Sequence, residues 1–416
     1  MSSLHAPSRR HLLLSSGTLF AWAYLPKVAR AEGRDPRFLT FILRGALDGL
    51  ATVAPVGDPG WAALRGDDAL TFAGKIPALK LDDDFALHPA MPNLHRMFAA
   101  GEAIVVHACA TPYRERSHFD GQDVLESGMP TPGHSDSGWL NRALATLAPG
   151  HRADPGGSRA LAVGPVTPLV VRGPAPILSW SPQRGLPASA DTLHRLHALY
   201  RETDPQLAQV FADNARLKAI EQAGDMAPSN PGKPKPVPGP AQVQAYFAEV
   251  AGNAAKILAQ ADGPRLGALA LDGWDTHYNE GIAKGRLAQL LGALDGALAA
   301  VKTNMGPAWR ETVVALVTEF GRTARINGTE GTDHGTGTVA LLAGGALKGG
   351  RVIADWPGLK PGDLYEGRDL AASTDLRAIL KGLLRDHLRV NERALAETVF
   401  PGSTGVKPMA GLLASS

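Results

Sequence analysis

The sequence predicts an α/β fold in which a mostly parallel central sheet is covered by helices. Two observations support this expectation. Short apolar segments rich in Val, Ile and Leu alternate with longer segments whose apolar residues recur at helical spacing. Polar residues suited to chemistry directly follow several of the apolar segments, as at the carboxyl ends of strands in α/β proteins, where ligands bind.

Five buried strands are expected, and each is short, apolar and rich in β-branched residues. They span residues 37–43, 103–109, 266–271, 313–317 and 339–343. Residues 160–171 hold two further apolar segments interrupted by proline, which indicates strands near an edge of the sheet.

Amphipathic helices are expected where apolar residues recur at helical spacing. The expected ranges are 91–100, 118–127, 241–262, 282–301 and 375–388, with two more helices in 189–223 separated at Asp204-Pro205. Residues 226–240, MAPSNPGKPKPVPGP, cannot hold regular structure and predict an exposed extended loop. We interpret this loop as an insertion in one α/β domain that spans residues 32–416.

The composition is that of a globular protein and excludes two kinds of site. The chain has 416 residues, of which 44% are hydrophobic and 20% are charged. Four of its 42 basic side chains lie in the first 31 residues, which leaves 38 against 40 acidic ones and no basic patch suited to nucleic acid. Cys109 is the only cysteine, so neither an internal disulfide nor a thiolate metal cluster can form.

The first 31 residues have the pattern of a twin-arginine export signal. Arg9 and Arg10 precede an apolar segment that ends in Ala29-Arg30-Ala31, a small-residue cleavage site. The apolar part is too short and too often interrupted by Ser, Gly and Pro for a stable membrane span. We therefore expect export by the twin-arginine translocase, cleavage near Ala31 and a mature protein that is periplasmic or secreted.

The segment 313–345 holds several candidate catalytic or metal-binding side chains between two expected strands. Thr318 and Glu319 follow the first strand, and Asp333-His334 precede the second, across a connection that also holds Arg322. An adjacent Asp and His offer a hard oxygen and a borderline nitrogen, which suit a divalent ion such as zinc or manganese. The alternative is structural: Asp333 caps the turn and His334 binds a backbone carbonyl.

Two other strand ends also present acids. The strand at 37–43 runs into Asp48, which is either a turn former or a metal ligand. The strand at 266–271 leads to Asp272-Gly273-Trp274-Asp275-Thr276-His277. In an extended segment Asp275 and His277 lie on one side and could hold an ion together, whereas in a turn both would be ordinary surface residues.

The strand at 103–109 is followed by Arg116-Ser117-His118 at the start of an expected helix. Ser117 is either the N-cap of that helix or a nucleophile or anion contact, since a helix start offers free backbone N–H groups. The two roles can coexist.

Several motifs together resemble an exported bacterial family of unknown function, DUF1501. The motifs are RGALDGL, RSHFDGQD, SGWLNR, LDGWDTH, TEFGRT, GTDHG and GGRVIADWPGL, and they span nearly the whole mature chain. The order of the strand-end residues is also similar to that in the alkaline phosphatase and sulfatase superfamily. This resemblance implies a three-layer αβα sandwich with an alkaline-phosphatase-like sheet.

The superfamily resemblance also implies a metal centre and a nucleophile. The divalent ion would be zinc, manganese, magnesium or calcium, and six side chains are its expected ligands: Asp48, Asp333 and His334 at one ion, Asp275 and His277 at a second, and Glu319 beside them. Ser117 is the expected nucleophile and His118 an acid or base. Arg116 or Arg322 would neutralise developing negative charge.

Two functions from different classes follow. The first is a periplasmic metal-dependent hydrolase that acts on a phosphate or related anionic ester, either a small molecule or a cell-envelope component. The second is a non-catalytic exported binding or assembly protein with a degenerate site. The hydrolase is the leading interpretation, and one feature favours the second: the only histidine after His334 is His387, inside an expected helix. The segment after Ser117 lacks the Cys/Ser-x-Pro/Ala-x-Arg motif of sulfatases, which argues against a sulfatase that uses this residue.

Overall fold

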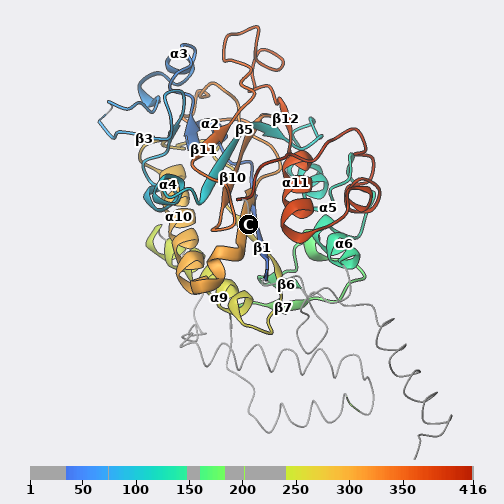
Figure 1. Ribbon diagram of the computed structural model, residues 1–416. Coiled ribbons are helices and arrows are strands. Elements are labelled where there is room, and N and C mark those ends of the chain that lie inside the picture. Colours follow the sequence, from blue (N-terminus) through green and yellow to red (C-terminus); the bar gives the residue numbers. More distant parts are fainter. Residues whose placement is uncertain (1–33, 74, 148–159, 183–200, 202–239, 415–416) are drawn as a thin grey trace, which may run out of the picture. The chain divides into compact units, whose positions relative to one another are not determined.

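A nine-stranded sheet gathers segments from almost the whole described chain (Figure 1). The structure is a computed structural model that describes residues 34–73, 75–147, 160–182, 201 and 240–414. The strands follow the order β11, β5, β10, β9, β1, β8, β6, β7, and β12 lies beside β5. Their bounds are β1 Arg37–Arg44, β5 Ala103–Ala110, β6 Ala160–Val163, β7 Leu178–Trp180, β8 Leu266–Asp272, β9 Thr312–Val317, β10 Thr338–Ala343, β11 Arg351–Ile353 and β12 Thr374–Asp375.

The sheet is mostly parallel, as the sequence predicted. β9, β1, β8, β6 and β7 pair in parallel, and β11 and β12 are parallel to β5. β10 is antiparallel to both β9 and β5, so among the strands of this sheet that the structure describes it alone runs against the others. The five strands expected from the sequence are confirmed, and each is one residue longer than expected.

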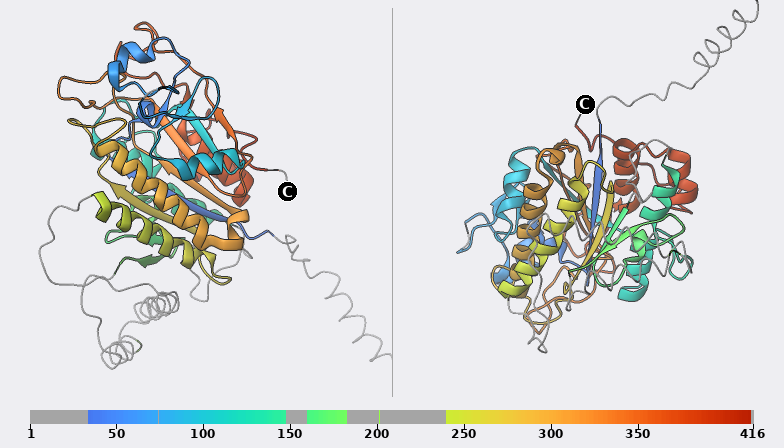
Figure 2. Two further views of the ribbon diagram at one scale, coloured as in Figure 1. Left: turned by 90° about the vertical axis from the view of Figure 1, so that its left-hand side faces the viewer. Right: turned by 90° about the horizontal axis from the view of Figure 1, so that it is seen from below.

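Helices cover both faces of the sheet (Figures 1 and 2). Side chains alternate along β1, so that Leu39, Phe41 and Leu43 enter one core while Phe38 and Ile42 enter the other. The first core lies under α4 (Pro92–Ala99), α9 (Pro240–Ala259) and α10 (Arg286–Met305). The second lies under α5 (His118–Ser127), α6 (Trp139–Thr146) and α11 (Leu376–Leu388). The expected three-layer αβα architecture is therefore confirmed.

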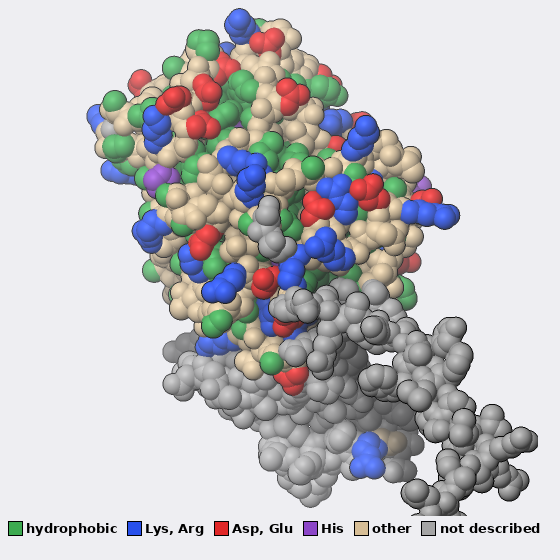
Figure 3. Space-filling view, viewed as in Figure 1, with side chains coloured by type: hydrophobic (Ala, Val, Ile, Leu, Met, Phe, Trp, Pro, Cys, Tyr) green, Lys and Arg blue, Asp and Glu red, His purple; other side chains and the backbone are tan. Residues whose placement is uncertain are grey.

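Short elements complete the unit between residues 35 and 416. The short helices are α2 Gly49–Thr52, α3 Trp61–Arg65 and α12 Glu392–Ala394, and a small antiparallel sheet joins β2 Val53–Ala54, β4 Ala86–Leu87 and β3 Leu79–Lys80. Three 3-10 turns, Gly66–Asp68, Leu169–Val171 and Gly306–Glu311, and one π-helical turn, Leu395–Val399, connect larger elements. On the face shown in Figure 3, acidic and basic side chains are interspersed.

Some expected elements differ from the structure. The second apolar segment of 160–171 forms a 3-10 turn instead of a strand, because Gly164, at φ 130°, and Pro168 turn the chain away from the sheet. The helix expected from residue 282 begins only at Arg286, since Gly285 has a φ of 134° that a helix cannot include. The segments 189–223 and 226–240 lie outside the described residues, apart from residues 201 and 240. Among the described residues, no helix is long and apolar enough to cross a membrane.

The register of the sheet brings several strand ends to one level. Arg44 of β1 lies opposite Asp272 of β8, and Ile42 of β1 lies opposite Val317 of β9. β5 runs in the same direction, because it and β9 are both antiparallel to β10. The segments that follow β1, β5, β8 and β9 therefore leave the sheet at the same edge, as ligand-binding segments of α/β proteins do.

Candidate metal centre

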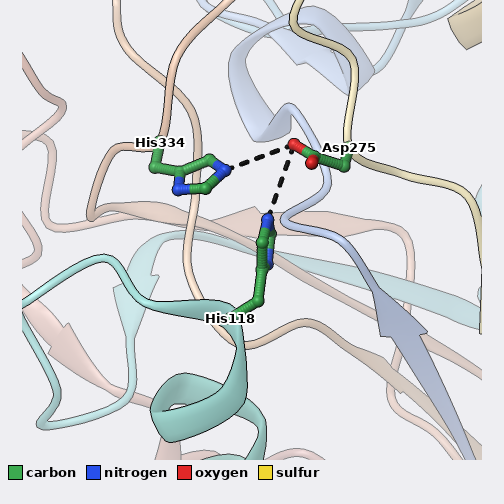
Figure 4. Close-up of side chains that lie close together, drawn as sticks. All are labelled: His118, Asp275 and His334. Carbon is green, nitrogen blue, oxygen red and sulfur yellow. Dashed lines mark hydrogen bonds and ion pairs between the residues drawn. The ribbon is translucent and has the colours of Figure 1, made fainter.

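Three histidines turn the same ring nitrogen, Nε2, toward one carboxylate oxygen, Oδ1 of Asp275. The distances to this oxygen are 3.1 Å for His277, 3.3 Å for His334 and 3.5 Å for His118. The Nε2 atoms of His277 and His334 lie 3.0 Å apart. Figure 4 shows His118 and His334 pointing at Asp275 from separate segments of the chain.

Each of these side chains comes from a segment at the same sheet edge. His118 is the first residue of α5 after β5, Asp275 and His277 follow β8, and His334 precedes β10. Two glycines allow the segments to approach one another. A Cβ at Gly45 would lie 2.6 Å from the backbone nitrogen of Asp275, and a Cβ at Gly331 would lie 2.3 Å from the carbonyl oxygen of His277.

The other ring nitrogen, Nδ1, of each histidine has an acceptor of its own. The pairs are His118 with Glu319 Oε1 at 2.9 Å, His277 with Asp333 Oδ1 at 3.3 Å, and His334 with the carbonyl oxygen of Arg116 at 2.9 Å. Carboxylate and carbonyl oxygens only accept, so each Nδ1 carries the hydrogen, and in a neutral ring Nε2 then has a lone pair. Histidines that bind metals have this arrangement, in which the outer partner fixes the ring and its tautomer.

The spacing and chemistry of these atoms suit a divalent ion. Ligands at about 2.0–2.1 Å from a tetrahedral ion lie about 3.3 Å from one another, and the four distances given above run from 3.0 to 3.5 Å. His118, Asp275 and His334 each offer a ligand atom, and these three atoms all lie within 4.8 Å of one another. His118 Nε2 is buried and has no hydrogen-bond partner among the described residues, although Asp275 Oδ1 lies 3.5 Å away. A bound ion would satisfy that atom.

Arg322 supplies a fixed positive charge on the buried side of the centre. Its Nη1 donates to Asp275 Oδ1 at 2.6 Å, and its Nε donates to the hydroxyl of Thr332 at 3.1 Å. Burial raises the pKa of the Asp275 carboxyl, but Arg322 outweighs this effect and the pKa is lowered. The Arg322 side chain is 0% exposed and that of Asp275 is 42% exposed, so the centre is closed on one side and open to solvent on the other.

Neighbouring charges also set the protonation of the histidines. The hydrogen bond to Glu319 raises the pKa of His118, against the effect of burial. Burial and the charge of His118 lower the pKa of His334. Burial alone would raise the pKa of Glu319, but the bond from His118 and its other donors lower it. Without an ion, the His118–Glu319 pair therefore holds a proton more firmly than His334 does.

Asp48 lies in a buried ion pair and is not one of the converging groups. Its carboxylate accepts from Arg65 at 2.6 and 3.2 Å, and its Oδ1 accepts the N–H of Ala51 at 3.0 Å as the N-cap of α2. This geometry corresponds to the structural interpretation of Asp48. The expected division into two ions also differs from the arrangement found, because His334 converges with Asp275 and His277 at one point.

Ser117 and Arg116 lie beside the centre. Ser117 occupies the N-cap position of α5, but its side chain makes no cap hydrogen bond, so its hydroxyl is not committed to the helix. The guanidinium of Arg116 pairs with Asp369 at 2.8 Å and with Glu366 at 2.5 Å, and only its backbone carbonyl contacts His334. The side chain of Arg116 is thus directed to the 365–369 segment, whereas that of Arg322 contacts the centre.

Sequence analysis selected most of these residues, although some of them contact partners other than those expected. His118, expected as an acid or base, presents a ligand atom, while Glu319 and Asp333, expected as ligands, contact histidine Nδ1 atoms. Two supporting amides were missed. Gln122 donates to Glu319 Oε1 at 3.1 Å, and Asn327 donates to Asp333 Oδ1 at 3.1 Å. Gln122 is one helical turn after His118, a spacing that could have indicated a shared partner.

Solved structures show a remote likeness. Ps i-CgsB in complex with k-i-k-neocarrahexaose has 12% identity and a TM-score of 0.41, over 90% of this chain and 78% of that one. A TAB5 alkaline phosphatase mutant with bound Mg has 10% identity and a TM-score of 0.37, over 77% and 94%. The Zn complex of the C-terminal periplasmic domain of EcEptC from Escherichia coli has 10% identity and a TM-score of 0.30, over 75% and 74%. At these TM-scores the likenesses imply nothing about the site.

No curated protein matches the sequence. One family model, described as "Protein of unknown function (DUF1501)", matches residues 37–399. The match begins at the first residue of β1 and ends at the π-helical turn Leu395–Val399, so it includes every residue of the metal centre described above. The chain therefore belongs to the DUF1501 family of proteins of unknown function.

Proposed function

We propose that this protein is a metal-dependent hydrolase that cleaves a phosphate or related anionic ester at a single-ion centre, with Ser117 as nucleophile. The observation that supports the proposal is the convergence of three histidine Nε2 atoms on Asp275, with each ring held by a separate Nδ1 partner. Nitrogen ligands with one carboxylate are a common set for zinc and similar ions. Asp275 and His277 are 42% and 43% exposed, so solvent and substrate can approach from that side.

A divalent ion held there would polarise the ester and make a nearby hydroxyl more acidic. Ser117 directly precedes His118, and its hydroxyl makes no cap bond to α5. Attack by its Oγ would form a phosphorus–oxygen bond to the serine while the ester bond breaks, and the hydroxyl proton would pass to the departing alcohol. Water would then cleave the phosphoserine, which releases phosphate and restores the serine hydroxyl. Arg322 keeps Asp275 ionised, and its positive charge offsets part of the negative charge of the centre that would otherwise repel an anionic ester.

The substrate we propose is a small anionic ester or a component of the cell envelope. This proposal depends on export by the twin-arginine translocase, cleavage near Ala31 and a location in the periplasm or outside the cell.

A non-catalytic exported binding or assembly protein is the second candidate. Asp48 favours it, because an acid that the superfamily resemblance assigns to an ion is instead paired with Arg65 at 2.6 Å. Without Asp48, the expected two-ion site is incomplete. In this second candidate, the cluster around Asp275 would bind a ligand or stabilise the fold without catalysing a reaction.

Metal content and turnover together test the proposal. The mature protein is dialysed against zinc or manganese, and bound metal is measured by elemental analysis beside Asp275→Ala, His334→Ala and Ser117→Ala. We expect one ion in the native protein, none in the first two variants, and an ion without ester turnover in Ser117→Ala. A native protein that folds but binds no divalent ion would exclude the hydrolase. A loaded protein that cleaves none of a panel of phosphate and sulfate esters would leave the binding protein as the better candidate.

A further inference from the structure

We infer that Glu280 is a positioning residue that ties together the two segments bearing the ligands of the centre. It would thereby set the affinity for the ion without touching it. The inference rests on the metal centre of the proposed function.

Glu280 forms a bridge between the two segments. Its side chain is buried, with the residue 1% exposed. Oε1 accepts the hydroxyl of Thr276 at 3.0 Å, and Oε2 accepts the hydroxyl of Thr332 at 2.9 Å. Thr276 lies between Asp275 and His277, and Thr332 directly precedes Asp333-His334. One carboxylate thus spans the segments on both sides of the point where the histidine nitrogens meet.

A second connection reaches Asp275 through Arg322. Because the hydroxyl hydrogen of Thr332 points to Glu280, the hydroxyl oxygen is free to accept from Arg322 Nε, at 3.1 Å. Arg322 in turn donates to Asp275 Oδ1 at 2.6 Å. Loss of the carboxylate would therefore disturb both the spacing of the segments and the orientation of the arginine that holds Asp275.

The bridge is itself fixed to the rest of the fold. The backbone N–H of Glu280 donates to the carbonyl of Glu330 at 2.9 Å, and its own carbonyl accepts from Leu287 at the start of α10 at 2.9 Å. Thr332 N–H also donates to the carbonyl of Thr276 at 3.1 Å. The carboxylate therefore completes a set of bonds that hold the two segments at one separation.

A glutamine at this position cannot reproduce the bridge. It offers one acceptor oxygen and one NH₂ group, whereas both threonine hydroxyls donate to the ionised carboxylate of Glu280. Burial raises the pKa of Glu280 to about 7, so the two proteins are compared above that pH. With the NH₂ group facing Thr332, the hydroxyl hydrogen of that threonine would lose its acceptor. Glu280→Gln thus keeps the size of the side chain and breaks the bridge.

Asp295 offers a matched control for a buried acid that joins other elements. It is 2% exposed and accepts from the backbone N–H groups of Asn93 and Leu94 at 3.0 and 2.8 Å, which ties α10 to α4. Asp295→Asn should reduce stability without changing the metal centre.

The test compares Co²⁺ binding by the mature native protein, Glu280→Gln and Asp295→Asn. Chelator competition measures the affinity for Co²⁺, and the visible absorption of bound Co²⁺ reports the geometry of its ligands. We expect Glu280→Gln to weaken binding by about 10- to 100-fold, the usual effect of losing an outer partner of the ligands, and to alter the spectrum. Asp295→Asn should stay within about twofold of the native affinity. Native binding together with an unchanged affinity and spectrum in Glu280→Gln would overturn the inference and leave the proposed function intact.

If no ion binds, the proposed function fails, but the bridge can still be tested. Amide hydrogen exchange of the metal-free proteins measures it directly. Glu280→Gln should exchange faster in 272–282 and 327–336, and Asp295→Asn should exchange faster in 92–99. If Glu280→Gln does not fold, Thr276→Val removes one of the two bonds and should show the same change at smaller size. Unchanged protection of both ligand segments in a folded variant would also overturn the inference.

Discussion

Replacing Asp48 by alanine tests whether this acid serves the fold or the metal centre. The side chains of Asp48 and Arg65 are 1% and 0% exposed, and they share two hydrogen bonds, of 2.6 and 3.2 Å. The guanidinium also donates to the carbonyls of Thr323 and Ala324 at 3.2 and 2.8 Å. These carbonyl oxygens accept hydrogen bonds from the Arg65 guanidinium but do not neutralise its positive charge. Asp48→Ala should therefore lower the free energy of unfolding while leaving metal binding unchanged.

The size of the loss follows from the burial of the pair. Removing one partner of a buried ion pair costs about 3–5 kcal/mol, and losing an N-cap costs about 1 kcal/mol. Burial raises the pKa of Glu280 to about 7, and the charge of Arg65 acts against this rise, so a second acid also interacts with the guanidinium. We therefore expect the low end for the ion pair, which together with the cap gives a total of about 4 kcal/mol.

Urea unfolding followed by tryptophan fluorescence measures this loss. With a slope of about 3 kcal/mol per molar urea, a loss of about 4 kcal/mol lowers the midpoint by about 1.3 M. The double variant Asp48→Ala/Arg65→Met removes both charges and should be more stable than the single variant. If Asp48→Ala loses its ion while its midpoint falls by less than about 0.3 M, Asp48 is a metal ligand and the structural argument is wrong.

Three further predictions concern the histidines. Asp333→Ala removes the acceptor of His277 Nδ1. We expect the variant to bind one ion with about 10-fold weaker affinity, measured by chelator competition. Loss of all binding would contradict the role of Asp333 as an outer partner of His277. Glu319→Gln weakens the contact to His118 Nδ1 and should reduce affinity by about 10- to 100-fold; native affinity would refute this. Burial lowers the pKa of His107 to about 4, below the unfolded value of about 6.5, so its contribution to stability is full above pH 6.5 and falls toward pH 4. Between pH 7 and 4.5 we expect the free energy of unfolding in urea to fall by about 2–3 kcal/mol more in the native protein than in His107→Asn. Equal losses would exclude His107 as the cause of this difference.

The strands were predictable because both faces of the sheet are covered, which requires nearly continuous apolar segments. β9, Thr312–Val317, is buried at every position and is recognisable from composition alone. The direction of β10 was not predictable from its own residues, since an apolar strand has the same composition in either direction. The connection offers the missing signal: between Val317 and Thr338 the structure has no helix, and a parallel neighbour would normally need a crossover helix.

The site was predictable in position but not in the direction of its side chains. Strand ends identified where Asp275, His277 and His334 would lie, because a buried parallel sheet fixes its edge. The role of Asp48 depends on Arg65, a residue 17 positions away that no local pattern connects to it. The role of His118 depends on which of its two ring nitrogens Glu319 binds. Both choices are made by packing between segments that are distant in the sequence.

The charges around the centre indicate which ion it suits. Asp275, Asp333 and Glu319 have pKa values lowered by their hydrogen-bond donors and charged neighbours, so together they carry three negative charges at neutral pH. Arg322 contributes one positive charge that is fixed by burial and by its bonds to Thr332. Two negative charges remain, and the raised pKa of His118 offsets part of them with a proton. A divalent ion would balance the remainder once His118 loses that proton, since a ligand nitrogen must be deprotonated. Charge balance thus favours a divalent over a monovalent ion and links its binding to proton release.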